Sequence, residues 1–322
     1  MKRQTLKSPI VVLAVLLASM SAMALKKDPN YLKARRNGAK AQIKVCVVDD
    51  CGVVVSNASI KVFMGMNFRP KGYWISGVTD ETGAFLVQGK TCGDEIDIYA
   101  AKQGFYDSKR KLRFAVMGAE HEVKDGKWLP YGAVETVPLR RIHNQVPLKS
   151  FGFGSGKAVP ATNTWIGVDM AYGDFIKPYG KGDRADFEVM VEWDGRPPIE
   201  CKLCTANIRF NEQLSGGYYA TNVPESEYPY VYRADEKESY SLRQVKVVCR
   251  GKSGRDEVCP LGNGAVLVTR TRCVLDESAK LSSACYGSIR IFDADAGWDG
   301  MPTMRLACVF NPTPNDTNLE SK

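Results

Sequence analysis

Three segments in the first third of the chain alternate apolar and polar residues with a period of two. Their apolar positions are Ile43, Val45 and Val47, then Ala58, Ile60 and Val62, then Ile96, Ile98 and Ala100. This period is typical of strands with one buried face. Turn-forming residues separate the segments, at 50–52, 80–83 and 92–94. The pattern predicts a small β-sandwich, which we place at residues 41–148, with a longer loop at 64–76 that carries Tyr73 and Trp74.

The second half of the chain has the same strand-like pattern. Its candidate strands are residues 186–193, 206–210, 244–249, 265–275, 282–292 and 304–310. None of them has the 3.6-residue period of an amphipathic helix. We therefore expect an all-β protein whose second, mainly antiparallel β domain covers residues 161–310. A glycine-rich linker is expected at 149–160 and a C-terminal tail at 311–322.

The first 24 residues have the features of a secretory signal peptide. A basic start is followed by an apolar run at residues 10–17 and by the pattern Ala22-Met23-Ala24, after which we expect cleavage. An uncleaved membrane anchor is the alternative, but the run is shorter than the roughly 20 residues that span a bilayer. We therefore expect an exported protein, periplasmic or extracellular, with no transmembrane span after cleavage.

The formal charge of +8 is confined to the N-terminal end of the sequence. The leader carries three basic residues and no acidic one, and residues 25–40 carry six basic residues and one acidic one. The remaining chain has 35 of each and no net charge. Because a nucleic-acid-binding protein is expected to carry its excess charge on the folded domain, we exclude nucleic acid as a partner. Residues 25–40 are interpreted as a basic linker, either solvated or in contact with anionic lipid headgroups.

Ten cysteines in an exported chain indicate disulfide bonds. Cys46 and Cys51 flank the first predicted turn and form one expected bridge. Folding the last long hairpin about residue 279 places Cys273 opposite Cys285 and gives a second bridge. Three cysteines lie in the first domain and seven beyond it. Complete pairing therefore requires a bridge between the domains; otherwise at least one thiol in each half stays free.

A zinc site is the alternative use of four of these cysteines. Cys201 and Cys204 form a C-x-x-C motif, which Cys249 and Cys259 could complete. However, the second pair is separated by nine residues rather than two to four, and export favours disulfides. We therefore expect disulfides rather than zinc.

Residues 293–300 place three carboxylates, Asp293, Asp295 and Asp299, in a glycine-containing turn. Calcium sites gather several oxygen ligands around a tight bend, so these three residues are the candidate metal ligands. The segment lacks the glutamate at the twelfth position of an EF-hand loop, where Met304 stands. An acidic turn without a metal is the alternative, and no other cofactor is expected.

A tyrosine-rich segment at residues 217–233 offers a candidate ligand-binding surface. Tyr228, Tyr230 and Tyr232 would share one face if this segment were a strand. Aromatic side chains on such a face stack on sugar rings or contact a protein partner. Packing against the other sheet is the alternative.

Four features of the first domain resemble the carboxypeptidase regulatory-like domains of exported proteins. They are Asp50 with Gly52, Ala58-x-Ile60-x-Val62, Thr79-Asp80-x-x-Gly83-x-Phe85, and Lys102-x-Gly104-Phe105. The resemblance implies a prealbumin-like, Ig-like sandwich of about seven short strands. It implies no activity, because proteins of this architecture differ in function. The His-x-x-Glu motif of the zinc peptidase domain that accompanies such modules does not occur in this sequence.

The second half resembles uncharacterised secreted two-domain proteins of bacteria. The matching features are residues 172–182, the pair Tyr286-Gly287, and residues 311–316. This resemblance also implies no activity.

Catalysis by a serine or cysteine nucleophile requires a neighbouring base. The two histidines, His121 and His143, both lie at the end of the first domain, so a histidine-based site would have to form between the domains. We therefore predict an exported, non-enzymatic binding or structural protein of the bacterial envelope or extracellular space, with a protein or a carbohydrate as its partner. The alternative is a secreted, glycan-directed hydrolase that uses carboxylates of the second domain.

Overall fold

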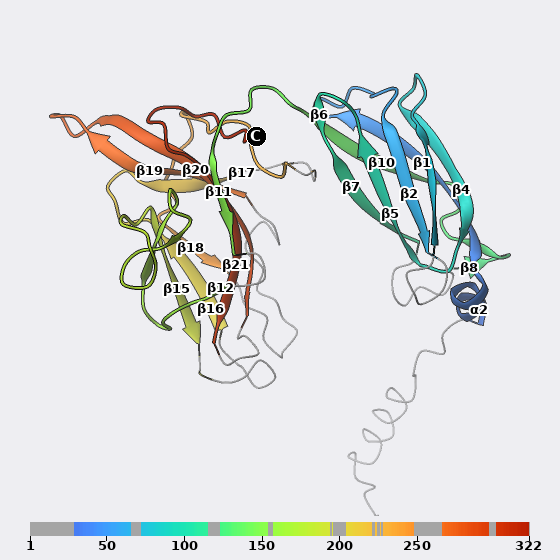
Figure 1. Ribbon diagram of the computed structural model, residues 1–322, viewed down its shortest axis with the longest axis horizontal. Coiled ribbons are helices and arrows are strands. Elements are labelled where there is room, and N and C mark those ends of the chain that lie inside the picture. Colours follow the sequence, from blue (N-terminus) through green and yellow to red (C-terminus); the bar gives the residue numbers. More distant parts are fainter. Residues whose placement is uncertain are drawn as a thin grey trace, which may run out of the picture. The chain divides into compact units, whose positions relative to one another are not determined.

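The structure is a computed structural model that describes residues 29–65, 72–114, 123–153, 157–193, 195, 204–220, 223, 226, 228–247, 266–295 and 301–321. Within these ranges the chain forms one α-helix and 21 strands, which confirms the all-β prediction (Figure 1). No helix in this part of the chain is long and apolar enough to span a membrane. The predicted signal peptide lies outside the described residues.

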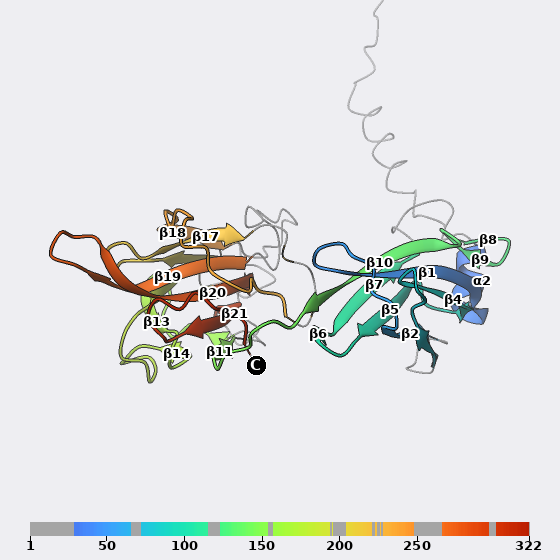
Figure 2. The ribbon, with the colours of Figure 1, turned by 90° about the horizontal axis from the view of Figure 1, so that it is seen from above.

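The chain divides into two compact units. The first contains Met1–Arg141 and Glu225–Glu227, and the second contains Ile142–Pro224 and Tyr228–Lys322. Each unit has its own strands (Figure 2). Each also has its own hydrophobic core.

The first unit is a sandwich of two sheets. The β1 sheet contains β1 (Ala39–Asp49), β4 (Ala84–Thr91), β6 (Phe105–Tyr106), β8 (Val123–Lys124), β9 (Lys127–Trp128) and β10 (Ala133–Arg141). The β2 sheet has the order β3-β2-β5-β7 and contains β2 (Ser59–Gly65), β3 (Gly72–Val78), β5 (Glu95–Ala101) and β7 (Ser108–Arg113). All pairs of the β2 sheet are antiparallel, whereas β1 pairs with β10 in parallel.

The core of the first unit is built from the alternating positions seen in the sequence. Every apolar residue of the three period-2 segments is buried and belongs to one cluster between the sheets. The turn at 80–83 follows from local chemistry, because Asp80 Oδ1 accepts the backbone N–H groups of Thr82 and Ala84 at 2.9 and 3.0 Å. Gly83 adopts a φ of 72°, which favours glycine.

The second unit is also built from two sheets. The β20 sheet contains β11 (Lys149–Gly152), β12 (Lys157–Ala158), β17 (Gly216–Ala220), β19 (Val266–Leu275), β20 (Leu281–Asp295) and β21 (Thr303–Asn311). The β15 sheet has the order β14-β13-β15-β16-β18 and contains β13 (Ile166–Asp169), β14 (Asp174–Phe175), β15 (Phe187–Trp193), β16 (Cys204–Arg209) and β18 (Gln244–Val247).

Residues of both sheets form the main core of the second unit. A smaller core lies around Tyr240, Tyr286 and Leu319 and includes Val268 and Ala284 of the β20 sheet. Consecutive residues of β19 and β20 are therefore buried, because both faces of these strands are covered.

Residues 25–40 were expected to be a linker, but residues 29–37 form helix α2 (Pro29–Asn37) and β1 begins at Ala39. The helix is held by contacts that no apolar period predicts. The ring of Tyr31 packs edge-on against Trp128 at 6.0 Å between centroids, and Arg35 Nη1 lies 2.6 Å from Asp94 Oδ1.

The expected linker at 149–160 and the expected tail at 311–322 also belong to the second unit. Strands β11 and β12 pair with β21, and Phe153 is buried in the main core. Near the C-terminus Leu319 is fully buried, and the Glu320 carboxylate accepts the backbone N–H groups of His143 and Asn144 at 2.8 and 2.6 Å. A single buried side chain in a polar segment leaves no periodic signal, so the sequence pattern did not show these contacts.

Candidate functional site

The outer face of the β2 sheet carries an aromatic cluster, which consists of the exposed Trp74 and the half-buried Phe63 and Tyr99. Trp74 lies directly opposite Phe63 on the neighbouring strand, and Tyr99 lies opposite Lys61. Since side chains alternate across a strand, this register places all three rings on one face. The inward neighbours Val62 and Ile98 are buried.

The three rings contact one another. The ring centroids of Phe63 and Trp74 are 5.1 Å apart with an angle of 54° between the planes, and those of Trp74 and Tyr99 are 5.6 Å apart at 59°. Trp74 is nevertheless 53% exposed. Packing on both sides therefore fixes the indole ring while about half of its surface stays open to solvent.

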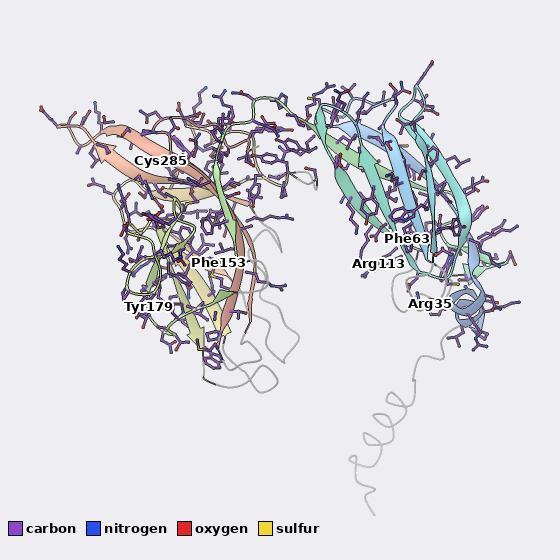
Figure 3. All side chains as sticks on the ribbon, in the orientation of Figure 1. Arg35, Phe63, Arg113, Phe153, Tyr179 and Cys285 are labelled. Carbon is purple, nitrogen blue, oxygen red and sulfur yellow. The ribbon has the colours of Figure 1, made fainter. Side chains whose placement is uncertain are left out.

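A row of cations runs beside the aromatic cluster on strand β7, and we call Lys109, Lys111 and Arg113 the basic row. Figure 3 shows the labelled side chains of Phe63 and Arg113, which come from β2 and from the end of β7. Lys109 Nζ lies 4.9 Å from the centroid of the Tyr99 ring and 3.3 Å from Asp97 Oδ1.

The other two cations of the basic row share one carboxylate. Lys111 Nζ lies 3.2 Å from Glu95 Oε2, and Arg113 Nε donates to Glu95 Oε1. The hydrogen bond from Lys111 is the main cause that holds the pKa of the Glu95 carboxyl below its usual value. The pKa of Lys109 is raised, chiefly by its interaction with the Tyr99 hydroxyl and also by Asp97. Lys109 and Glu95 are therefore charged at neutral pH.

Sequence reasoning missed this cluster because it assigned residues 64–76 to a loop, whereas β3 extends from Gly72 to Val78. The available signal was an aromatic residue at the polar position of an alternating strand. Phe63 follows the buried Val62, and Tyr99 stands between the buried Ile98 and Ala100.

The three predicted ligand-binding tyrosines do not lie on a regular strand. Tyr228 is 4% exposed, and its hydroxyl donates to the carbonyl oxygens of Leu319 and Val231. The rings of Tyr228 and Tyr232 stack with centroids 5.7 Å apart, and Tyr230 packs against Tyr228 at 5.8 Å. Tyr228 is therefore buried by packing within the second unit, and a ligand-binding role for the three tyrosines stays a prediction.

The predicted calcium ligands are only partly within the described residues. The backbone of Asp293 and Asp295 belongs to β20, where these residues pair with Arg305 and Thr303. Asp299 lies outside the described residues, so the calcium site stays a prediction.

Among the described residues, Asp49, Asp50 and Cys51 form a cluster of possible metal-ligating atoms. Asp49 already accepts hydrogen bonds from the backbone of Cys51 and Val53 and from Arg141 Nη2, at 3.0, 2.9 and 2.9 Å. This carboxylate therefore closes a turn and an ion pair, which explains its burial without a metal.

The structure contains neither predicted disulfide bridge: Cys46, Cys51, Cys273 and Cys285 are all free thiols. Cys46 lies inside β1, opposite Thr136 and Ala84, whereas Cys51 is exposed in the following turn. Cys46 and Cys51 therefore do not face each other across a two-stranded hairpin.

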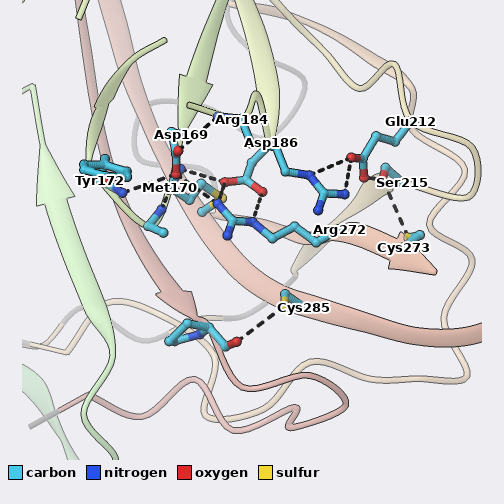
Figure 4. Close-up of polar contacts among 12 residues, drawn as sticks. Asp169, Met170, Tyr172, Arg184, Asp186, Glu212, Ser215, Arg272, Cys273 and Cys285 are labelled. Atoms are coloured by element: carbon cyan, nitrogen blue, oxygen red, sulfur yellow. Dashed lines mark hydrogen bonds and ion pairs between the residues drawn. The ribbon is translucent and has the colours of Figure 1, made fainter. Parts of the chain in front are cut away.

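The second bridge is displaced by a β-bulge. Thr271, not Cys273, lies opposite Cys285, because the register shifts between Thr271 and Val274. Instead the Cys273 thiol lies 3.6 Å from Ser215 Oγ, and Cys285 Sγ lies 3.7 Å from the carbonyl oxygen of Pro312 (Figure 4).

The bulge also directs Arg272 into a buried pair of carboxylates, Asp169 and Asp186. Arg272 has a φ of 53°. Its Nε donates to Asp186 Oδ1 at 2.8 Å, and its Nη2 donates to Asp169 Oδ1 and Asp186 Oδ2 at 2.9 Å each (Figure 4). The two aspartates are 2% and 3% exposed.

Asp169 and Asp186 also bind the backbone around them. Asp169 Oδ2 accepts the N–H groups of Asp183 and Arg184 at 3.1 and 3.2 Å, and Asp186 Oδ2 accepts that of Met170 at 2.7 Å. Burial alone would raise the pKa of the Asp169 carboxyl, but these donors and Arg272 outweigh it, and the pKa is lowered. The pair is therefore engaged in holding loops together, which is not the state of a general acid or base.

Of the two histidines, His143 packs edge-on against Tyr232 with 4.7 Å between ring centroids. His121 lies outside the described residues.

No family model matches the chain, and no curated protein matches it. Among solved structures it is similar to chlorocatechol 1,2-dioxygenase from Pseudomonas putida, with 15% identity, a TM-score of 0.26, and coverage of 32% of this chain and 61% of that one. It is also similar to wild-type Acinetobacter radioresistens catechol 1,2 dioxygenase, with 10% identity, a TM-score of 0.27, and coverage of 34% and 55%.

The chain thus spans less than two thirds of the length of either dioxygenase. The finding amounts to a distant structural similarity to dioxygenase β-sandwich domains. Similarity at this level implies nothing about the activity of this chain.

Proposed function

We propose that the chain is an exported, non-enzymatic binding protein of the bacterial envelope or extracellular space, with its first β-sandwich as the scaffold. The observation that carries this proposal is the exposed Trp74 ring, held between the half-buried rings of Phe63 and Tyr99 on the outer face of the β2 sheet. The partner is a carbohydrate or a protein that covers this face.

Contiguous aromatic rings on the outer face of a sheet are typical of interaction sites, whereas single exposed apolar residues are common on any protein surface. Tryptophan and tyrosine supply much of the binding energy at protein interfaces. Their rings also offer flat apolar surface together with a polar group. The aromatic cluster has this composition, and the rigid strands β2, β3 and β5 hold it in place.

Two sequence features support the scaffold and the location. The resemblance of residues 41–148 to carboxypeptidase regulatory-like domains favours a non-catalytic module, and the predicted leader at residues 1–24 favours export. Neither feature names the ligand.

The glycan-directed hydrolase is the less supported alternative. It requires a pair of accessible carboxylates in the second unit. The neighbouring carboxylates of Asp169 and Asp186 in the second unit are buried and accept hydrogen bonds from Arg272 and from backbone N–H groups. No observation on the described residues favours hydrolysis.

The proposal is tested with purified residues 25–322 on a panel of envelope polysaccharides and proteins, scored for both retention and product formation. We expect retention without product, and loss of retention in Trp74→Ala. Leu86→Ala is the matched control, because Leu86 is also 53% exposed but lies on the other sheet. Turnover by the wild-type protein would contradict the proposal, as would equal retention by the Trp74→Ala variant.

A further inference from the structure

We propose that the ligand of the β2 sheet is an acidic polysaccharide, that is, a polymer of sugar rings that carry carboxylates. This inference rests on the proposed binding function and adds the chemical class of the ligand. It is motivated by the position of the basic row beside the aromatic cluster.

The outer face of the β2 sheet carries more positive than negative charge. Lys61 lies on this face opposite Tyr99 and Ser76, and the basic row adds three more cations. The carboxylates on the same face are Glu95 and Asp97. Four cations against two carboxylates leave a local excess of two positive charges, although the chain beyond residue 40 has no net charge.

The cations are also more exposed than the carboxylates. The side chains of Lys109, Lys111 and Arg113 are 49%, 57% and 69% exposed, whereas those of Asp97 and Glu95 are 29% and 32% exposed. A ligand that approaches the face therefore meets the ammonium and guanidinium groups first. An anionic ligand fits this arrangement, since complementary charge promotes association.

The rings and the cations are close enough to contact one repeating unit of a polymer. The Tyr99 ring lies 5.6 Å from that of Trp74 and 4.9 Å from the Lys109 ammonium group. Neighbouring strands of a sheet are about 4.8 Å apart. The rings on β3, β2 and β5 and the cations on β7 therefore follow one another across the sheet at about this spacing, and an extended polysaccharide that crosses the strands contacts them in turn.

An acidic sugar offers both groups that this pattern requires: an apolar ring face for the indole and a carboxylate for a lysine. A neutral sugar lacks the charge, and an acidic peptide lacks the ring face on every unit. Single-stranded nucleic acid also combines stacking with negative charge. However, proteins that bind it carry a basic folded body, and this chain is neutral beyond residue 40.

The test compares polygalacturonate with its fully methyl-esterified form, in which the same rings carry no charge. Alginate is included as a second polyuronate and hyaluronan as a polymer in which only alternate sugars are uronates. A thymidine oligonucleotide is included as the nucleic-acid probe. Binding to residues 25–322 is measured by calorimetry at two salt concentrations. We expect the ester to bind at least about fivefold more weakly than the acid, and high salt to weaken only the acid.

Variants separate the two parts of the surface. Trp74→Ala should weaken binding to polygalacturonate about 30-fold, and Lys109→Gln and Lys111→Gln about two- to fivefold each. Glu95→Gln should strengthen binding about twofold, because it removes a carboxylate that neutralises Lys111 and Arg113. Lys44→Gln and Leu86→Ala, which change the outer face of the β1 sheet, should leave binding unchanged.

Equal affinity for the acid and its ester would overturn the acidic class but leave the proposed binding function intact, since Trp74→Ala would still reduce retention. Absence of binding to all three acidic polysaccharides, or tighter binding to the oligonucleotide, would also overturn it. Failure of the proposed function itself has a different signature: retention of every panel member that is insensitive to Trp74→Ala.

Discussion

Arg272 and Asp186 lie 86 residues apart in the sequence, and the guanidinium group of Arg272 donates to both carboxylate oxygens of Asp186, from Nε at 2.8 Å and from Nη2 at 2.9 Å. Nη2 also donates to Asp169. This contact joins a bulge in β19 to the residues that precede β15 and end β13. Because the carboxylates are buried, loss of the guanidinium group would leave them without their counter-charge.

We expect Arg272→Ala to lower the free energy of unfolding of the second unit by about 3–5 kcal/mol, because it leaves two buried carboxylates unpaired. Arg272→Lys should recover only part of this loss, since an ammonium group lacks the planar fork that reaches both aspartates. Urea denaturation followed by circular dichroism measures the change. The control is Arg184→Ala, which breaks a solvent-accessible pair with Glu212 and should cost about 0–1 kcal/mol. Equal losses of unfolding free energy in Arg272→Ala and Arg184→Ala would show that the buried ion pair contributes no more stability than the solvent-accessible one.

The stability of the second unit should fall in acid through Asp169. The pKa of its carboxyl is lowered from the ordinary value of 3.8: burial opposes this shift, but the backbone N–H groups and Arg272 outweigh it. A carboxyl with a depressed folded-state pKa contributes stability above its unfolded pKa, and this stability is lost as the pH falls through the folded value. We therefore expect unfolding free energies that are constant from pH 7 to 5 and decrease below about pH 4. In Asp169→Asn the unfolding free energy should be lower at pH 7 and should vary less below pH 4, and a parallel decrease in both proteins would contradict this role.

Replacing a buried threonine hydroxyl should affect the unfolding free energy differently at Thr269 in the second unit and at Thr79 in the first. The Oγ1 atoms of Thr269 and Thr271 are buried and have no hydrogen-bond partner among the described residues. Thr269→Val should therefore leave the unfolding free energy unchanged or raise it by up to about 1 kcal/mol, because the isosteric methyl group needs no partner. Thermal denaturation of the purified variant measures this.

Thr79→Val is the matched control for that substitution. The Thr79 hydroxyl donates to the Val55 carbonyl oxygen at 2.7 Å and accepts the Ala58 N–H at 2.9 Å. Its removal should cost about 1–3 kcal/mol, because both backbone groups lose a partner in a buried site. A loss of similar size in Thr269→Val would show that its hydroxyl has a partner in solution.

The reactivity of the cysteines should follow burial. Burial raises the pKa of the Cys273 and Cys285 thiols, so both are protonated at neutral pH and react slowly, whereas Cys51 is exposed. We expect iodoacetamide to modify Cys51 in the folded protein and to modify Cys273 and Cys285 only after denaturation. Mass mapping under non-reducing conditions reads this out, and a peptide that links Cys273 to Cys285 would contradict the bulged register of β19 and β20.

The C-terminal residues should contribute measurably to the second unit. Leu319 is fully buried in the smaller core, so Leu319→Ala should lower the unfolding free energy by about 2–5 kcal/mol. Leu86→Ala, at a half-exposed position, should change it by less than about 0.5 kcal/mol. Comparable melting curves for Leu319→Ala and the wild-type protein would show that this segment does not belong to the folded unit.

Local sequence was sufficient to predict the strands and their class. Residues such as Ile43, Val62 and Ile98 alternate with polar neighbours, and an alternating segment has only one way to bury its apolar face. Asp80 and Gly83 likewise determine their turn through contacts within five residues. The buried core of the first unit and the all-β class follow from such short-range patterns.

The tertiary structure alone decided which residues meet. The aromatic cluster exists because the register of β2 with β3 and β5 brings Phe63, Trp74 and Tyr99 to one face, and register is a property of pairs of strands. The bulge at Arg272, which moves Cys273 out of register with Cys285, also depends on residues that are distant in sequence. The Arg272 side chain donates to Asp169 and Asp186, about one hundred residues earlier in the chain. Periodicity along one segment reports which side is buried, whereas partners that are distant in sequence are selected by the free energy of the whole fold.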